Sequence, residues 1–202
     1  MPRTETRERI LDAARELFVT EGYDGVTMRK VAEKIEYSPT AIYVYFKDKE
    51  ELFRELCHED YARLAEVFMS SAMSTEPIQR LKQIGQIYVE FGMRNPNHYK
   101  FMFMTPHPAH QLDDVDREMH GNPERDAYAF LKWAVQQAID AGGFREELKD
   151  AEVISQTLWA SVHGVISLEI AKGCDEWVEW RPIKDRMEMM LDLTLRGLVR
   201  AS

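Results

Sequence analysis

Apolar residues recur with a helical period along most of the chain, and no segment shows the strict alternation of a half-buried strand. The first apolar stripe comprises Ile10, Leu11, Ala14, Leu17 and Phe18. It predicts a helix that ends at Gly22. Thr27 and Ser38 then occupy N-cap positions before two short helices, the second with Pro39 at its first position. Three brief helices are therefore expected in the first quarter of the chain.

A long amphipathic helix is predicted next, because Asp48 can cap it and Glu51 stands three residues on, as in a capping box. If it runs to about Ser71 it is roughly 36 Å long, enough to connect two bodies. Later periodic segments predict helices at about 76–94, from Asn95, from Asn122 to Gly142, at 150–172 and at 182–200. The expected fold is all-α with about nine helices. The short helices are expected to form one domain, residues 1–49, and the longer helices a second, residues 50–202.

The third short helix is predicted to bury Ile42 and Phe46, which lie within about 40° of each other on a helix. Thr40 and Val44 then point away, with Ala41, Tyr43 and Tyr45 on the flanks. Solvated helices normally present Lys and Glu, so this outer surface suits a partner. A DNA major groove is one candidate, because methyl groups meet thymine and hydroxyls reach phosphates or base edges. A protein surface and an incidental flank are the alternatives.

The order of these elements favours DNA. A helix, a short helix, a tight turn and a second short helix form the helix-turn-helix plan, whose second helix enters the major groove. Arg29, Lys30, Lys47 and Lys49 flank it and could face phosphate. The net charge of −9 is distributed unevenly, since residues 1–54 carry 10 basic and 11 acidic side chains. A polyanion is therefore expected to meet the N-terminal quarter.

The segments GYDGVTMRKVAEKI and YSPTAIYVYFKDKEELF resemble the N-terminal DNA-binding domain of the TetR family of bacterial repressors, over about residues 5–55. The resemblance implies phosphate contacts from Thr27, Tyr43 and Lys49, groove contacts from Ser38, Pro39, Thr40, Ala41 and Tyr45, and a base-edge contact from Arg29. One position departs from the family pattern, because Glu36 stands in the turn where glycine is usual. A positive φ at Glu36 would carry a modest strain.

The segment LWASVHGVISLE, residues 158–169, resembles the Trp-x-x-x-His-Gly helix of one TetR C-terminal subgroup. This resemblance implies a homodimer through the two last helices, about 150–172 and 182–200, and their apolar surfaces independently favour such pairing. It also implies a pocket for a small-molecule effector. The candidate pocket residues are Tyr88, Phe91, Phe101, Phe103, Tyr128, Trp133, Trp159 and His163. Core packing is the alternative role for each of them.

Other chemistry is weakly indicated. Nitrogen and oxygen ligands gather at His107, His110, Asp113, Asp114, Asp116 and His120, but a solvated acidic loop explains them better, and neither a metal nor a cofactor is expected. The chain has no Gly-rich phosphate loop, nucleophile elbow or HExxH motif, so an enzyme is not expected. There is no apolar run of about 18 residues and no signal peptide, and Cys57 and Cys174 lie in no metal spacing. A cytoplasmic protein is predicted.

These features predict a dimeric, ligand-responsive transcription regulator, a repressor that a small molecule releases from double-stranded operator DNA. Two alternatives come from other classes. One is an all-helical ligand-binding or catalytic protein that retains a helix-turn-helix. The other is an interaction module that turns the surface of Tyr43, Val44 and Tyr45 toward a protein.

Overall fold

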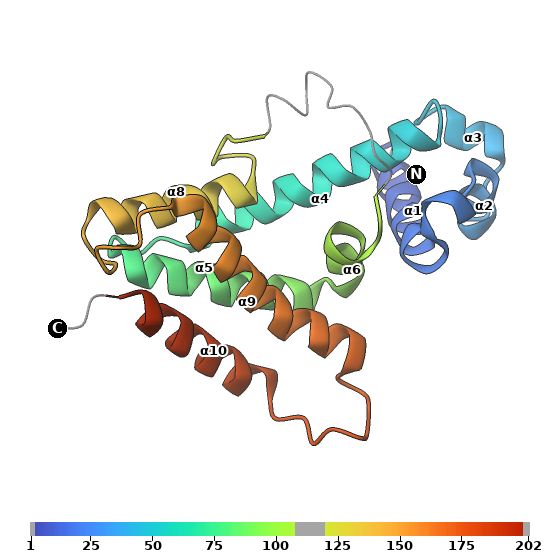
Figure 1. Cartoon of the computed structure of the whole chain (residues 1–202). Coiled ribbons are helices and arrows are strands. Elements are labelled where there is room, and N and C mark those ends of the chain that lie inside the picture. The colour runs from blue at the N-terminus through green and yellow to red at the C-terminus, as the bar shows by residue number, and fades with distance from the viewer. Residues whose placement is uncertain (1–2, 108–119, 200–202) are drawn as a thin grey trace. The chain divides into compact units, whose positions relative to one another are not determined.

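The computed structural model describes residues 3–107 and 120–199. Within these residues the chain forms nine α-helices and no strand beyond a single antiparallel bridge between Phe144 and Val199 (Figure 1). The predicted all-α class is confirmed. The described chain divides into two compact units, residues 3–61 with 95–107 and residues 62–94 with 120–199. This division does not coincide with the predicted boundary between residues 49 and 50, which concerns function and stays a prediction.

The first unit contains the short N-terminal helices that the caps predict. Its elements are α1 (Arg3–Gly25), α2 (Met28–Lys34), α3 (Pro39–Tyr43), the first part of α4 (Lys49–Ser71) and α6 (Pro96–Met104). Helical geometry in α1 breaks at Gly22, where φ is 71° and ψ is 173°. The Thr27 hydroxyl accepts the Lys30 N–H at 3.2 Å, and the Ser38 hydroxyl accepts the Ala41 N–H at 3.3 Å. Both predicted N-caps are therefore confirmed.

Aromatic rings fill the centre of the first unit. Ile42 of α3 and Phe46, which lies three residues past its end and donates its N–H to the Ile42 carbonyl, are both buried, as predicted. Phe18 of α1 meets the edge of Phe53 of α4 with ring centroids 5.0 Å apart, and Phe101 of α6 lies 5.2 Å from Phe53. These contacts make α6 part of the same core as α1 and α4.

A buried carboxylate also joins these three helices. Asp60 of α4 accepts two hydrogen bonds from the Arg15 guanidinium of α1, both at 2.8 Å, and its Oδ1 lies 2.9 Å from Nδ1 of His98 in α6. Asp60 is 1% exposed and Arg15 is 4% exposed. Paired, hydrogen-bonded geometry of this kind is what makes a buried charge tolerable. We call Arg15, Asp60 and His98 the Asp60 cluster.

The second unit is a bundle of longer helices. Its elements are the rest of α4, α5 (Pro77–Arg94), α8 (Ala127–Asp140), α9 (Ala151–Lys172) and α10 (Ile183–Leu198). Helix α5 contacts α8, α9 and α10, and α9 also contacts α8 and α10 (Figure 1). At Gly85 a Cβ atom would lie 2.5 Å from Cδ2 of Leu191 and 3.3 Å from Cγ1 of Val162. The missing side chain of Gly85 thus allows α5, α9 and α10 to approach closely.

One predicted helix start is wrong. Asn122 does not open α8, because its carbonyl oxygen accepts the N–H groups of Arg125 and Asp126 in a turn. The helix begins at Ala127, with the Asp126 carboxylate accepting the Tyr128 and Ala129 N–H groups at 2.8 and 3.1 Å. The apolar stripe of α8 also begins at Ala127, so packing selects the later of two available caps.

Across residues 3–107 and 120–199, no helix is both long and apolar enough to cross a membrane.

Candidate DNA-binding surface and polar node

Helix α3 presents small and hydroxyl-bearing side chains to solvent. Ser38, Pro39 and Thr40 are exposed at its start, and Tyr43 and Val44 are 53% and 63% exposed at its end. The flanking Ala41 and Tyr45 are half-buried. We define the recognition surface as Ser38, Pro39, Thr40, Ala41, Tyr43, Val44 and Tyr45. Exposed apolar groups beside exposed hydroxyls form a surface that can approach base edges and phosphates closely.

The turn before α3 adopts the strained conformation expected of it. Glu36 has a φ of 61°, in the left-handed region that favours glycine. The Glu36 N–H donates to the Glu33 carbonyl at 3.2 Å, and the Tyr37 N–H donates to the Ala32 carbonyl at 2.9 Å. This pair of bonds is the Schellman motif that ends a helix, with Glu36 at the position where glycine is most common. The strain is therefore a consequence of ending α2 immediately before the turn.

Two cations of α2 are paired with carboxylates. The exposed Arg29 donates from Nε to Glu33 Oε1 at 2.7 Å, which raises the pKa of the Arg29 guanidinium. Lys30 reaches back to the Glu21 carboxylate and to the Gly25 carbonyl oxygen, 2.7 Å away. Exposed ion pairs of this kind contribute little to stability. They can therefore open for a phosphate at small cost.

The two lysines after α3 differ. The side chain of Lys47 is 84% exposed, and its ammonium lies 3.8 Å from the Asp48 carboxylate. The Lys49 ammonium instead donates to the Tyr23 carbonyl oxygen at 2.9 Å and lies 4.1 Å from the centroid of the Tyr23 ring. Without DNA, the Lys49 side chain therefore points toward Tyr23 of α1.

In the second unit, a hydroxyl links α5 to α9. The Tyr88 hydroxyl accepts a hydrogen bond from Nε1 of Trp159 at 3.0 Å and lies 3.4 Å from Nδ1 of His163. Burial lowers the pKa of His163, which favours the neutral ring. Nδ1 of a neutral ring can accept a hydrogen bond from the Tyr88 hydroxyl. We call Tyr88, Trp159 and His163 the Tyr88 node.

A second polar group borders this node. Glu152, in the first turn of α9, accepts from the Tyr128 hydroxyl at 2.5 Å and from the Lys132 ammonium at 2.7 Å. These bonds, the Lys132 bond first, lower the pKa of Glu152 to about 2. Burial and the bond to Glu152 raise the pKa of Tyr128 to about 12. The Tyr128 ring lies 5.8 Å from Trp159, so four predicted pocket residues are brought together. Glu152 is not among the residues predicted from the sequence, although it lies in the first turn of a predicted helix.

Of the other four predicted pocket residues, Phe91 is buried in α5 and three have defined neighbours outside the Tyr88 node. The Arg80 guanidinium lies over the Trp133 ring of α8, with its central carbon 4.9 Å from the ring centroid. Phe101 and Phe103 belong to the first unit, where Phe103 packs 5.0 Å from the Tyr99 ring. The structure therefore places Phe101 and Phe103 in a different core from the Tyr88 node.

The described residues contain no group of three or more His, Cys, Asp or Glu side chains placed to hold a metal. His107 Nε2 lies 2.8 Å from the Phe101 carbonyl oxygen, and His120 lies 3.8 Å from the Asp126 carboxylate. The remaining members of the loop cluster, His110, Asp113, Asp114 and Asp116, lie outside the described residues.

Comparison with known families gives two matches. Residues 10–56 match the family described as bacterial regulatory proteins, tetR family, and residues 81–194 match the tetracyclin repressor-like C-terminal domain. The chain belongs to the TetR family. The first match contains the recognition surface, and the second contains the Tyr88 node. Assignment to the Trp-x-x-x-His-Gly subgroup stays a prediction.

Named relatives of this TetR-family chain are regulators. It is 30% identical over 167 residues to the HTH-type transcriptional repressor AcnR of Corynebacterium glutamicum, an alignment that covers 81% of each chain. AcnR of Corynebacterium efficiens is 41% identical over 135 residues, which cover 66% of this chain and 59% of that protein.

Solved structures share the fold. A TetR family transcription regulator from Marinobacter aquaeolei superposes with a TM-score of 0.78 at 15% identity, covering all of both chains. The structure of a SmeT–triclosan complex superposes with a TM-score of 0.69 at 22% identity, covering 98% of this chain and 93% of the other. At these identities the similarity is one of fold.

Proposed function

We propose that the protein is a homodimeric repressor that binds operator DNA through the recognition surface and is released when a small molecule binds the second unit. The exposed outer face of α3 carries this proposal. Tyr43 and Val44 are more than half exposed on a short helix whose other side is fixed by Ile42 and Phe46. A rigid helix with small, methyl-bearing and hydroxyl-bearing residues outside is suited to a major groove.

The contacts proposed for DNA divide into two kinds. Thr27 and Tyr43 supply hydroxyls at the two edges of the motif and are proposed to bind phosphate, which fixes register. The α3 residues from Ser38 to Ala41, with Tyr45, are proposed to line the groove. Arg29 is proposed to reach a base edge, once DNA displaces its exposed bond to Glu33. Repression as the sign of regulation is supported by the name of the AcnR relatives.

Dimerisation is proposed through α9 and α10. These adjacent helices leave large apolar side chains in solvent, among them Leu168 on α9 and Met189 and Leu193 on α10, each at least half exposed. A second copy would cover this face around a two-fold axis. Two heads could then meet successive major grooves about 34 Å apart.

The proposed effector region surrounds the Tyr88 node. The SmeT–triclosan complex supports small-molecule binding in a protein of this fold. Residues 1–49 are proposed as the DNA-binding part and residues 50–202 as the regulatory part, with no catalytic role for either. A coupling of about 1–3 kcal/mol between them would change operator affinity roughly 5- to 150-fold.

Titration of the protein onto a duplex from upstream of its own gene, at several salt concentrations, tests the DNA-binding claim. We expect a specific, salt-sensitive complex that Tyr43→Phe weakens about tenfold, because a hydroxyl contact to a charged phosphate is lost. Arg29→Ala is expected to weaken binding and relax base preference. Tyr128→Phe is the matched control, since it removes a hydroxyl from the second unit.

The absence of any salt-sensitive complex would refute this function. A protein partner without DNA affinity would support the interaction module instead, and turnover of a bound compound would support a catalytic protein.

A further inference from the structure

We propose that Lys49 is a positioning residue that fastens the start of α4 to the end of α1, and that Lys47 makes the phosphate contact from this segment. The inference rests on the proposed DNA binding. It departs from the role that family resemblance implies for Lys49, which is a direct phosphate contact.

Both interactions of the Lys49 ammonium are with one residue. Its Nζ donates to the Tyr23 carbonyl oxygen at 2.9 Å and lies 4.1 Å from the Tyr23 ring centroid. A carbonyl oxygen and the negative face of an aromatic ring both attract a cation. Tyr23 follows Gly22 directly, at the break in α1. The ammonium therefore fixes the backbone at the point where the chain leaves α1.

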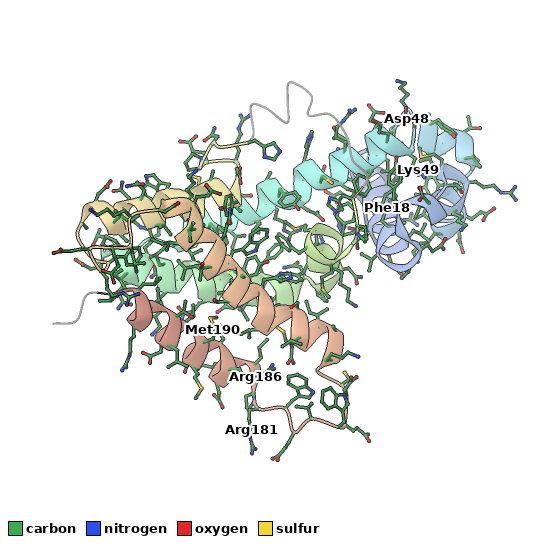
Figure 2. The ribbon with its side chains drawn as sticks, in the orientation of Figure 1. Phe18, Asp48, Lys49, Arg181, Arg186 and Met190 are labelled. Atoms are coloured by element: carbon green, nitrogen blue, oxygen red, sulfur yellow. The ribbon has the colours of Figure 1, made fainter. Side chains whose placement is uncertain are left out.

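Tyr23 is itself held in place. Its ring stacks on Phe18 with centroids 5.9 Å apart, and it meets Phe53 edge-on at 5.1 Å. Figure 2 shows Lys49 and Phe18 within the first unit, on α4 and α1 respectively. Lys49 is thus attached to a ring that the aromatic core already orients, rather than to a mobile side chain.

The charges around Tyr23 oppose a phosphate at this place. Burial, followed by the charges of Glu50, Asp48 and Asp24, raises the pKa of the Tyr23 phenol. Three carboxylates close enough to act on Tyr23 would also repel a DNA phosphate that approached Lys49 from that side.

Lys47 differs from Lys49 in its exposure, although Asp48 borders it too. Its side chain is 84% exposed, and its ammonium lies 3.8 Å from the Asp48 carboxylate. Its backbone N–H is satisfied by the Glu51 carboxylate, which fixes the base of the side chain. An exposed ammonium on a fixed backbone, next to the end of α3, is well placed to meet the phosphate that borders the groove.

The position of the Lys49 contact explains what it would accomplish. Tyr23 lies near the end of α1 and Lys49 begins α4, and α2, the turn and α3 all lie between these two residues. Fastening Lys49 to Tyr23 closes this segment at its ends. Its loss is expected to loosen α3 without removing any contact to DNA.

The test compares matched substitutions, Lys49→Met and Lys47→Met, on a duplex from upstream of the gene. Lys47→Met is expected to reduce the slope of log affinity against log salt by about 1.8, because each copy of the homodimer loses one phosphate contact. Its melting temperature without DNA should not change. Lys49→Met is expected to leave the salt slope unchanged, weaken binding several-fold at every salt concentration, and lower the melting temperature by about 3–6 °C.

Two further variants check the partner. Lys49→Arg, which keeps a cation over the ring, should recover most of the lost melting temperature and affinity. In a double-mutant cycle, Tyr23→Leu and Lys49→Met should be coupled, so that their effects on melting temperature are not additive.

Loss of about 1.8 from the salt slope in Lys49→Met with an unchanged melting temperature would overturn the inference. Additive effects in the cycle would also overturn it. If the wild-type protein bound no DNA, the proposed function and the role of Lys47 would both fail. The coupling of Lys49 to Tyr23 would still be measured without DNA, so the two failures are distinguishable.

Discussion

In the first unit a carboxylate joins three helices, whereas in the second unit a phenol joins two. Asp60, buried in α4, binds a guanidinium from α1 and a histidine from α6. Tyr88, buried in α5, binds an indole and a histidine that both belong to α9. The two junctions have similar geometry but differ in charge.

This difference in charge determines how much free energy is lost when a contact of each junction is broken. Removing one partner of a buried ion pair costs about 3–5 kcal/mol, because the other charge stays uncompensated. Leaving a neutral polar group without its partner costs about 1–3 kcal/mol. The second range matches a typical allosteric coupling energy. We therefore expect the first unit to move as one body and the second to contain the adjustable contacts, as a DNA-reading part and a ligand-sensing part require.

The largest effect is expected from Asp60→Asn, which removes the buried carboxylate that pairs with Arg15 and leaves this guanidinium bonded to the exposed Asp12 carboxylate. Its free energy of unfolding, measured by chemical denaturation, should fall by about 3–5 kcal/mol. Asp12→Asn is the matched control, because Asp12 also binds Arg15, at 2.6 Å, but its side chain is 74% exposed. It should change stability by less than about 1 kcal/mol. Equal losses of stability in the two variants would show that burial of the carboxylate does not determine its contribution to the free energy of unfolding.

A smaller effect is expected from Tyr88→Phe, which removes the acceptor for Trp159 and keeps the ring. The free energy of unfolding should fall by about 1–2 kcal/mol. Tyr128→Phe, which removes a hydroxyl bound to Glu152, is the control and should cost less than about 0.5 kcal/mol. A loss from Tyr88→Phe as large as that from Asp60→Asn would remove the contrast between the two junctions.

Relief of the backbone strain at Glu36 in the first unit should increase the free energy of unfolding. Glu36→Gly removes the Cβ from a residue at φ 61° and is expected to raise the free energy of unfolding by about 0.5–1 kcal/mol, after the entropy of glycine is counted. Glu36→Ala keeps the strain and is the control. If glycine and alanine gave the same stability, the left-handed conformation would not be costly here.

The smallest effect concerns pH. Because burial lowers the folded-state pKa of His163 below 6.5, the unfolded chain takes up a proton first as the pH falls. This contribution to stability is complete above about pH 6.5 and is lost progressively below it. The test measures the free energy of unfolding of wild type and of His163→Gln from pH 7.5 down to about 5. The difference between the two should shrink as the pH falls. A difference independent of pH would contradict a half-buried, neutral His163.

Local chemistry explains why so much of the first unit was predictable. Thr27, Ser38 and Asp48 act as caps where the sequence places them, since each cap bonds only to N–H groups two or three residues away. The positive φ of Glu36 follows from the same local geometry. Cap chemistry alone is not sufficient, because α8 begins after Asp126 and not at the predicted Asn122.

Contacts between distant segments were not predictable in this way. Arg15 and Asp60 lie 45 positions apart, and Lys49 lies 26 positions from Tyr23. Their pairing depends on how the helices pack, which hydrophobic periodicity does not specify. For the same reason the aromatic residues of the helices could be named as pocket candidates but not sorted. Phe101 joins the core of the first unit, while Tyr88 and Trp159 meet in the second.

The central claim is that two copies of α3 read successive major grooves. Footprinting of the protein on the DNA upstream of its gene, with probes of major-groove contact, tests it most directly. We predict two protected patches about one helical turn, or 34 Å, apart, both lost with Tyr43→Phe at moderate salt. Uniform protection without a preferred site, or two patches that survive substitution of the recognition surface, would contradict the account.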